Sequence, residues 1–164
     1  VDIARGVLHR PRVLFLDEPT IGLDPINRRA IWRYIERLRA ELGATVLLTT
    51  HYLEEAEDCH RVLFLNRGRV IGDGAPGELI GALGQSVLEV TTDRPDTVEE
   101  HLAQHLEAPI REGDRLLFRI RGEDPDIAAL RSELGDAAHA INLRRPDLND
   151  VYVWLNRSET PLAA

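Results

Sequence analysis

The chain has 164 residues, of which 43% are hydrophobic and only 5% aromatic, and its formal net charge is −8. This composition is typical of globular proteins and predicts two small cores rather than one large domain. The negative charge argues against a nucleic-acid-binding protein, because polyanion binders are usually strongly basic. No apolar run approaches the ~20 residues of a membrane-spanning helix, and the N-terminal residues show no signal-peptide pattern.

The first chemically informative feature is an apolar run that ends in two adjacent carboxylates. Residues 13–16 (VLFL) lead directly into Asp17 and Glu18. A short continuous apolar run predicts a strand covered on both faces, as in a parallel sheet, and ligands bind at the carboxyl ends of such strands. Two neighbouring acids repel each other unless a cation such as Mg²⁺ compensates them. The alternative is that Asp17 only caps the following turn.

A well-marked helix is expected over residues 25–42. Asp24 is a favourable N-cap, Pro25 suits the first helical position, and Gly43 ends the pattern. One face of this helix should be buried. Its apolar members are Ile26, Ala30, Ile31, Tyr34, Ile35, Leu38 and Leu42.

A second apolar strand, residues 45–50 (TVLLTT), ends at His51. A strand, a helix and a strand of these lengths form a crossover unit, so the two strands should be parallel and the crossover right-handed. The carboxyl ends of parallel strands meet at one edge. We therefore expect Asp17, Glu18 and His51 to converge in space.

Residues 16–25 (LDEPTIGLDP) and 48–57 (LTTHYLEEAE) closely resemble the ATP-binding subunits of ABC transporters, in particular the drug-exporter and ABC-2 (daunorubicin-resistance-like) branch. The resemblance implies that Asp17 is the Walker B aspartate, which holds Mg²⁺ through its water shell. It implies that Glu18 polarises the attacking water and that His51 is the switch histidine that senses the γ-phosphate of ATP. Asp24 would belong to the loop that crosses to a partner subunit. Without the resemblance, Asp24 is simply an N-cap and His51 an ordinary histidine at a strand end.

Other parts of the ABC pattern are missing from the sequence. There is no Gly-x-x-x-x-Gly-Lys-Ser/Thr loop, and all twenty cationic residues of the Lys and Arg class are arginine. The signature and glutamine-loop segments are also absent, and residues 1–8 resemble the helix that follows the signature. We therefore expect residues 1–84 to be the C-terminal part of an ABC ATPase domain, spanning the Walker B to switch-histidine half of a P-loop NTPase parallel sheet. We expect the isolated chain to bind ATP negligibly.

Between the switch histidine and residue 84 the sequence predicts three short elements. Residues 52–58 should form a solvated helix, and residues 61–65 and 69–72 a hairpin with its turn at residues 66–68. Residues 74–79 resemble the segment that closes the family's ATPase domain before a short helix. Cys59 and His60 do not indicate a metal site, because there is one cysteine and no paired ligand spacing.

Residues 85–164 predict a second, small α+β domain. Strands are expected at residues 87–91, 115–121 and 138–143, and helices at 93–106, 124–134 and 146–155. Asp124 and Pro125 should cap the middle helix. The region resembles the accessory domain of drug-exporter ATPases, with residues 148–152 as the best local match. Its strand arginines suggest a solvated face or a contact with a partner subunit: Arg115, Arg119 and Arg121.

The fold class expected is thus a partial α/β P-loop sheet followed by a small α+β domain. The function implied by the resemblance is an exporter ATPase that uses ATP and Mg²⁺ and works with membrane permease subunits and a second ATPase subunit. Such a protein would lie in the cytoplasm at the inner face of the membrane. The alternative is an inert remnant or interaction module that docks on a partner through residues 85–164. DNA-repair and translation ATPases share Asp17, Glu18 and His51, but residues 50–56 resemble exporters better.

Overall fold

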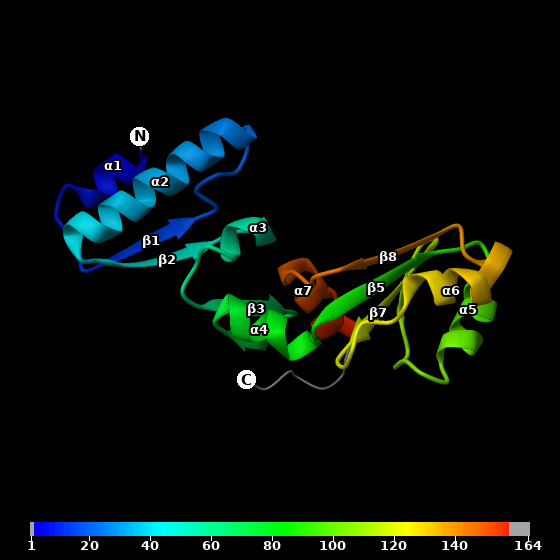
Figure 1. Ribbon diagram of the computed structural model, residues 1–164. Helices are drawn as coiled ribbons and strands as arrows, with labels where there is room; N and C mark the ends of the chain where they lie inside the picture. Colours follow the sequence, from blue (N-terminus) through cyan, green and yellow to red (C-terminus); the bar gives the residue numbers. More distant parts are fainter. Residues whose placement is uncertain (1, 158–164) are drawn as a thin grey trace. The chain divides into compact units, whose positions relative to one another are not determined.

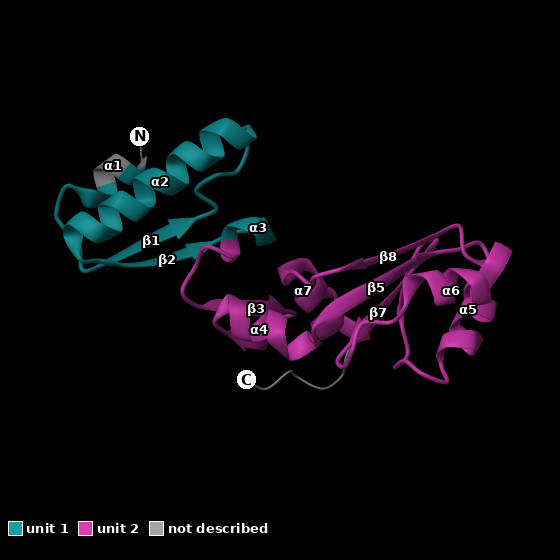
Figure 2. Ribbon diagram, viewed as in Figure 1, with its two compact units in different colours: residues 1–55 teal, residues 56–164 magenta. Residues whose placement is uncertain are grey.

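The computed structural model describes residues 2–157, which form a mixed α/β protein. The chain divides into two compact units, with the change between Glu55 and Ala56 (Figure 2). Each unit has its own sheets and its own core, and each is described separately below. The predicted domain boundary after residue 84 is a different division of the chain, and it stays a prediction.

The first unit is a two-stranded parallel sheet with helices (Figure 1). The strands pair in parallel from Val13 opposite Thr45 to Asp17 opposite Thr49, which confirms the predicted pairing. Asp24 and Gly43 cap the long helix as predicted, and Gly43 adopts the left-handed conformation with φ 61°. The elements are α1 (Asp2–Val7), β1 (Val13–Asp17), α2 (Pro25–Leu42), β2 (Thr45–Thr49) and α3 (Leu53–Ala56), whose last residue already belongs to the second unit.

The core of this unit lies on one face of the sheet only. Helices α1 and α2 lie on the same side of β1 and β2 (Figure 1), and they cover Leu14 and Leu16. On the opposite face Phe15 is 72% exposed and Leu47 is 52% exposed. The prediction that β1 is covered on both faces is therefore wrong for the described residues. A continuous apolar run indicates that both faces of a strand can be buried, but burial of both faces also requires an element packed on each side.

The apolar face predicted for α2 is also only partly buried. Ile35 is 3% exposed, and Ile31 packs beside it against the strand residues. Ile26 is 78% exposed and Tyr34 is 37% exposed, and Ala30 lies on the same exposed side. The two narrow strands cannot cover the whole apolar arc of a helix of this length. The spacing of the apolar residues identified the apolar face of α2, and the width of the sheet decided how much of that face is buried.

The second unit begins with the predicted hairpin, β3 (Val62–Asn66) and β4 (Arg69–Gly74). Arg67 and Gly68 both have positive φ, 48° and 75°, which suits a two-residue turn that follows the twist of the strands. Helix α4 (Pro76–Leu83) follows. In the described residues β3 pairs with β4 alone, so the hairpin is a sheet of its own.

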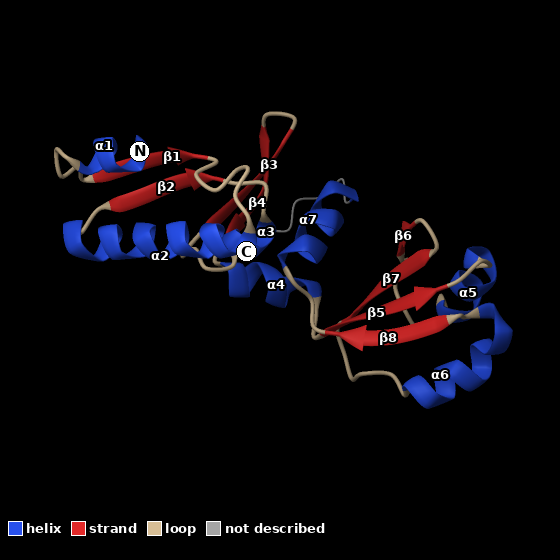
Figure 3. Cartoon of the chain, turned by 90° about the horizontal axis from the view of Figure 1, so that it is seen from above, coloured by secondary structure: helices blue, strands red, loops and turns tan. Residues whose placement is uncertain are grey.

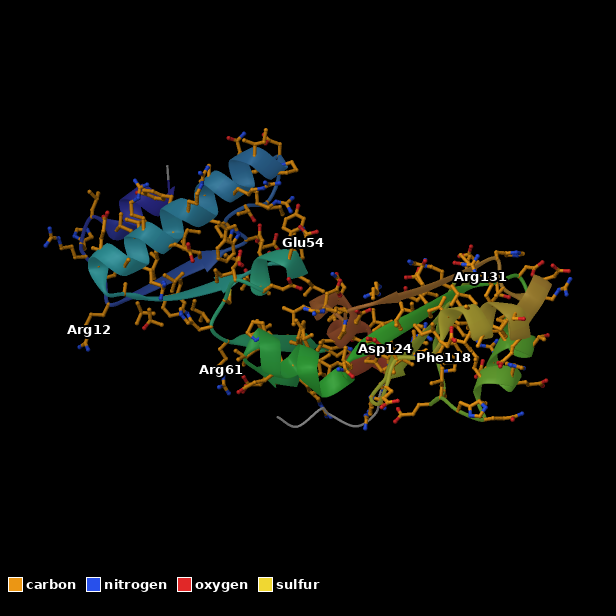
Figure 4. All side chains as sticks on the ribbon, viewed as in Figure 1. Arg12, Glu54, Arg61, Phe118, Asp124 and Arg131 are labelled. Carbon is orange, nitrogen blue, oxygen red and sulfur yellow. The ribbon has the colours of Figure 1, made fainter. Side chains whose placement is uncertain are left out.

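A four-stranded antiparallel sheet with the order β6-β7-β5-β8 forms the rest of this unit (Figure 3). Its core is built from one face of β5, β7 and β8 and from the inner sides of α5 and α6, and it centres on the fully buried Phe118 (Figure 4). The elements are β5 (Ser86–Thr91), α5 (Pro95–Leu102), β6 (Ile110–Glu112), β7 (Arg115–Ile120), α6 (Ile127–Leu134), a 3₁₀ turn (Gly135–Ala137) and β8 (Ala140–Arg144).

Three expectations for this region need correction. Helix α5 ends at Leu102 and not at residue 106. Helix α6 is capped by Asp126, whose carboxylate accepts hydrogen bonds from the N–H groups of Ala128 (2.8 Å) and Ala129 (3.2 Å), and not by Asp124. Strand β6 was not predicted, because three residues are too short for a periodic pattern.

The C-terminal helix α7 (Leu148–Arg157) packs on α4 and β4. Its Leu155 lies so close to Gly72 that a Cβ there would come within 2.6 Å of the leucine side chain. The amide of Asn66 donates a hydrogen bond to Asn156 from the hairpin side. Trp154 of the same helix is 5% exposed. Among residues 2–157 no helix combines the length and hydrophobicity that a membrane crossing requires.

Candidate functional site

Asp17 and Glu18 leave the sheet at the carboxyl end of β1, where Thr49 of β2 lies opposite. The Thr49 hydroxyl donates a short hydrogen bond to Oδ1 of Asp17. The same hydroxyl accepts a hydrogen bond from the backbone N–H of Glu18 at 3.0 Å, and the Thr49 carbonyl accepts from that N–H at 3.1 Å. One threonine therefore fixes both acids at the sheet edge.

Glu18 has a φ of 43°, a backbone conformation that residues other than glycine rarely adopt. Such a conformation costs on the order of 1–3 kcal/mol and persists where the surroundings determine it. Here the two hydrogen bonds to Thr49 hold it. The turn brings the Glu18 carboxylate to His51, whose Nδ1 lies 3.5 Å from Oε2.

The predicted convergence of Asp17, Glu18 and His51 is therefore confirmed as geometry. The His51 side chain is 51% exposed and that of Glu18 is 40% exposed, so both present polar atoms to solvent. A general base and a hydrogen-bond donor that act on a bound ligand must be reachable in this way. The arrangement supplies carboxylates and an imidazole side by side at one sheet edge.

Asp24 is occupied locally as the N-cap of α2. Its Oδ1 accepts hydrogen bonds from the backbone N–H groups of Ile26 (2.9 Å) and Asn27 (3.0 Å), and the Asn27 side chain donates to Oδ2. These donors, Asn27 first, hold the pKa of Asp24 below its usual value. In the described part of the chain, Asp24 does not contact the Asp17, Glu18 and His51 group.

The segment after His51 differs from expectation in length and in burial. Helix α3 spans Leu53–Ala56 and not residues 52–58. Glu55 is only 4% exposed, whereas Glu54 on the same helix is exposed (Figure 4). The prediction of a fully solvated helix is therefore wrong. Glu55 accepts a hydrogen bond from the Thr50 hydroxyl at 2.7 Å, and Nε of Arg28 lies 3.7 Å from its other oxygen. A buried carboxylate needs such partners, because burial disfavours its charged form.

Sequence reasoning missed the four residues that support the acids and the histidine: Arg28, Thr49, Thr50 and Glu55. Thr49 and Thr50 read only as the end of an apolar strand, and Arg28 and Glu55 as members of charged helix faces. The signal that could have found Thr49 is its register, since the predicted parallel pairing sets the end of β2 beside the end of β1.

The donor set fits a hydrated divalent cation rather than an enclosed metal site. Asp17 uses Oδ1 for Thr49, which leaves its second oxygen able to accept from a metal-bound water. In residues 2–157 no three of the His, Cys, Asp and Glu side chains form a group that could hold a metal ion by themselves. Mg²⁺ commonly keeps several waters and is bound by one or two carboxylates together with substrate phosphates.

Comparison with known proteins finds close relatives for almost the whole chain. A Nod factor export ATP-binding protein I of Burkholderia thailandensis is 40% identical over 162 residues, which cover 96% of this chain and 51% of that protein. The chain is similar to export ATP-binding proteins. Proteins of the same name from Cupriavidus metallidurans (39% over 162 residues) and Ralstonia nicotianae (40% over 166 residues) match equally widely.

These similarities support the relationship to ABC transporter ATP-binding subunits indicated by residues 16–25 and 48–57. The chain spans about half the length of the curated relatives it matches. No protein-family profile matches it.

Proposed function

We propose that this chain supplies the Walker B and switch-histidine half of the ATP-binding subunit of an ABC exporter. Asp17 would hold the Mg²⁺ of Mg–ATP through water, Glu18 would orient and polarise the attacking water, and His51 would donate a hydrogen bond to the γ-phosphate. The observation that carries the proposal is the contact between His51 Nδ1 and Glu18 Oε2 at 3.5 Å beside the Asp17–Thr49 hydrogen bond.

These residue types suit phosphoryl transfer, in which a protein mainly positions groups and stabilises charge. Glu18 can accept a proton from water at the open sheet edge, and His51 can donate to a phosphate oxygen. Asp24 would serve both as the cap of α2 and in the loop toward a second ATPase subunit. Membrane permease subunits would receive the work of hydrolysis, which would place the protein in the cytoplasm at the inner face of the membrane. Residues 1–84 of this chain would then be the C-terminal part of the ATPase domain, and residues 85–164 would be an accessory domain.

The test requires phosphate-binding residues that the printed sequence does not contain. A segment that supplies a P-loop is fused in frame before residue 1, and Mg²⁺-dependent phosphate release is measured. We expect hydrolysis in the parent chimera. Glu18→Gln should lower the turnover rate at least about a hundredfold while ATP stays bound, because the amide keeps the shape of the carboxylate but cannot accept a proton.

The control is Glu54→Gln, an exposed glutamate on α3 that should leave turnover unchanged. Normal turnover in the Glu18→Gln chimera would refute the role given to Glu18. A chimera that folds and binds ATP but never hydrolyses it would favour the second candidate, a non-catalytic module that docks on a partner through residues 85–164. The printed chain by itself should show no micromolar affinity for Mg–ATP in calorimetry.

A further inference from the structure

The turn that carries His51 is spanned by a chain of side-chain hydrogen bonds. Residues 50–52 lie between the last residue of β2 and the first residue of α3 and belong to neither. Across this turn, the Thr50 hydroxyl accepts a hydrogen bond from the N–H of Tyr52 at 3.0 Å and donates one to Oε2 of Glu55 at 2.7 Å. The Thr50 side chain thus bridges the turn on both sides of His51, from residue 50 to Tyr52 and Glu55.

The far end of this chain is a charged pair packed on an aromatic ring. The carboxylate of Glu55 is 4% exposed, and Nε of Arg28 lies 3.7 Å from its Oε1. The Arg28 guanidinium also stacks over the Tyr52 ring at 3.6 Å from the centroid, a distance at which a cation is attracted to the ring face. The Tyr52 ring lies 4.1 Å from the His51 ring, centroid to centroid.

Thr49, the last residue of β2, and Thr50, the first residue after it, serve different parts of the site. The Thr49 hydroxyl bonds to Asp17 and to the N–H of Glu18, whereas the Thr50 hydroxyl bonds to Tyr52 and Glu55. Thr49 therefore fixes the acids, and Thr50 fixes the turn that presents the imidazole to them.

We propose that Thr50 and Glu55 are positioning residues that hold the His51 imidazole against Glu18. The half-exposed imidazole has one polar contact with the acids, at 3.5 Å, and its backbone lies outside any helix or strand. Without the Thr50–Glu55 hydrogen bond the turn loses a side-chain tie to α3 but keeps the backbone bond from the Glu55 N–H to the Tyr52 carbonyl at 3.0 Å. The His51 ring is then held less firmly at its distance from Glu18. The catalytic consequence rests on the proposed function, since misplacement by about 1 Å can cost on the order of a hundredfold in rate.

The structural part is tested on the full printed chain by NMR. Thr50→Val removes the hydroxyl at nearly constant volume, and we expect the Tyr52 amide to exchange with solvent about tenfold faster, as the loss of one hydrogen bond implies. Thr50→Ser should restore the slow exchange. Thr45→Val, at the exposed start of β2, is the matched control and should leave the exchange rate of the Tyr52 amide unchanged.

The position of the ring is read from its own NMR signals. Glu18→Gln defines the ring chemical shifts of His51 when the carboxylate is lost, and Thr50→Val and Glu55→Gln should both move the shifts toward those values. Variants that lower the thermal stability but leave the His51 signals at their wild-type positions would overturn the proposal, because that is the result expected of a purely structural pair.

The P-loop chimera gives an independent catalytic readout. We expect Thr50→Val to lower kcat about tenfold with KM for ATP nearly unchanged, and Thr50→Ser to recover most of the rate. In a His51→Ala background, Thr50→Val should cause no further loss, because it acts only through the imidazole. An equal loss in both backgrounds would refute the positioning role. A chimera without any ATPase activity would count against the proposed function alone, since the NMR result decides the positioning independently.

Discussion

Replacing Asp150 should destabilise the second unit more than any other single change of a carboxylate there. Asp150 is 3% exposed, and its carboxylate accepts hydrogen bonds from Nη1 and Nη2 of Arg144 at 2.6 and 2.8 Å. It also accepts one from the N–H of Asp147 at 2.9 Å, while the Asp147 carboxylate accepts from the N–H of Asp150 at 3.0 Å. This reciprocal pair closes the first turn of α7 in the manner of a capping box.

The magnitude follows from these contacts. Breaking a fully buried ion pair costs about 3–5 kcal/mol, but the Arg144 side chain is 37% exposed and water can solvate it in part. We therefore assign about 2–3 kcal/mol to the loss of the pair in Asp150→Ala and about 1 kcal/mol to the loss of the cap. With a urea m-value near 2 kcal/mol/M, a total of about 3–4 kcal/mol lowers the unfolding midpoint by about 1.5–2 M.

The assay needs a probe for the second unit alone, because a chain of two units need not unfold in one step. The chain has two tryptophans, so a Trp32→Phe background leaves Trp154 on α7 as the only fluorescent reporter of that kind. Asp136→Ala, at an exposed carboxylate in the same unit, is the control and should not shift the midpoint. A shift below about 0.3 M for Asp150→Ala would refute the reasoning. So would full additivity with Arg144→Met, because two partners of one ion pair must couple.

Two further predictions concern glycine geometry and acid stability. Gly84→Ala should destabilise the second unit by at least about 2 kcal/mol, because φ is 138° and the new Cβ would lie 2.3 Å from the Ile120 carbonyl oxygen. Urea unfolding followed by Trp154 fluorescence measures this loss of stability. An unchanged unfolding midpoint would contradict the prediction. Asp24 has a folded pKa below the ordinary 3.8, so its contribution to the stability of the first unit is present above that pH and is lost as the pH falls through the lowered value. Asp24→Asn keeps a capping side chain but cannot titrate, so the difference in stability between wild type and variant should shrink below about pH 4. Trp32 fluorescence in a Trp154→Phe background measures the stability of the first unit. A difference that is constant with pH would show that the cap does not titrate as described.

Local signals in the sequence predicted the elements that carry the acids and the histidine. The apolar run before Asp17, the cap at Asp24 and the left-handed Gly43 each act over a few residues, and each is found where expected. The turn of the hairpin is of the same kind, since Arg67 and Gly68 supply the positive φ values that it needs. Parallel pairing of β1 and β2 followed from the length of the connection between them.

Misassigned boundaries arose where two local signals competed. Asp124 and Asp126 both precede α6 and both are favourable caps, and the structure uses the one whose carboxylate reaches the N–H groups of the first turn. Residues 103–106 continue the apolar pattern of α5, and Leu106 packs on the core, but the helix itself ends at Leu102. Burial of one apolar residue does not require that the helix continue to it.

The sequence by itself determined which chemistry this chain can offer, because residue type and spacing along strands and helices fix Asp17, Glu18 and His51 at one sheet edge. The tertiary structure alone decided what holds that chemistry in place. The hydrogen bonds of the Thr49 hydroxyl, the contact of the buried Glu55 with Arg28 and the exposed side of β1 depend on which segments lie against one another. The physical reason is distance along the chain: caps and turns act within about four residues, whereas burial and long-range hydrogen bonds join residues that no local pattern relates.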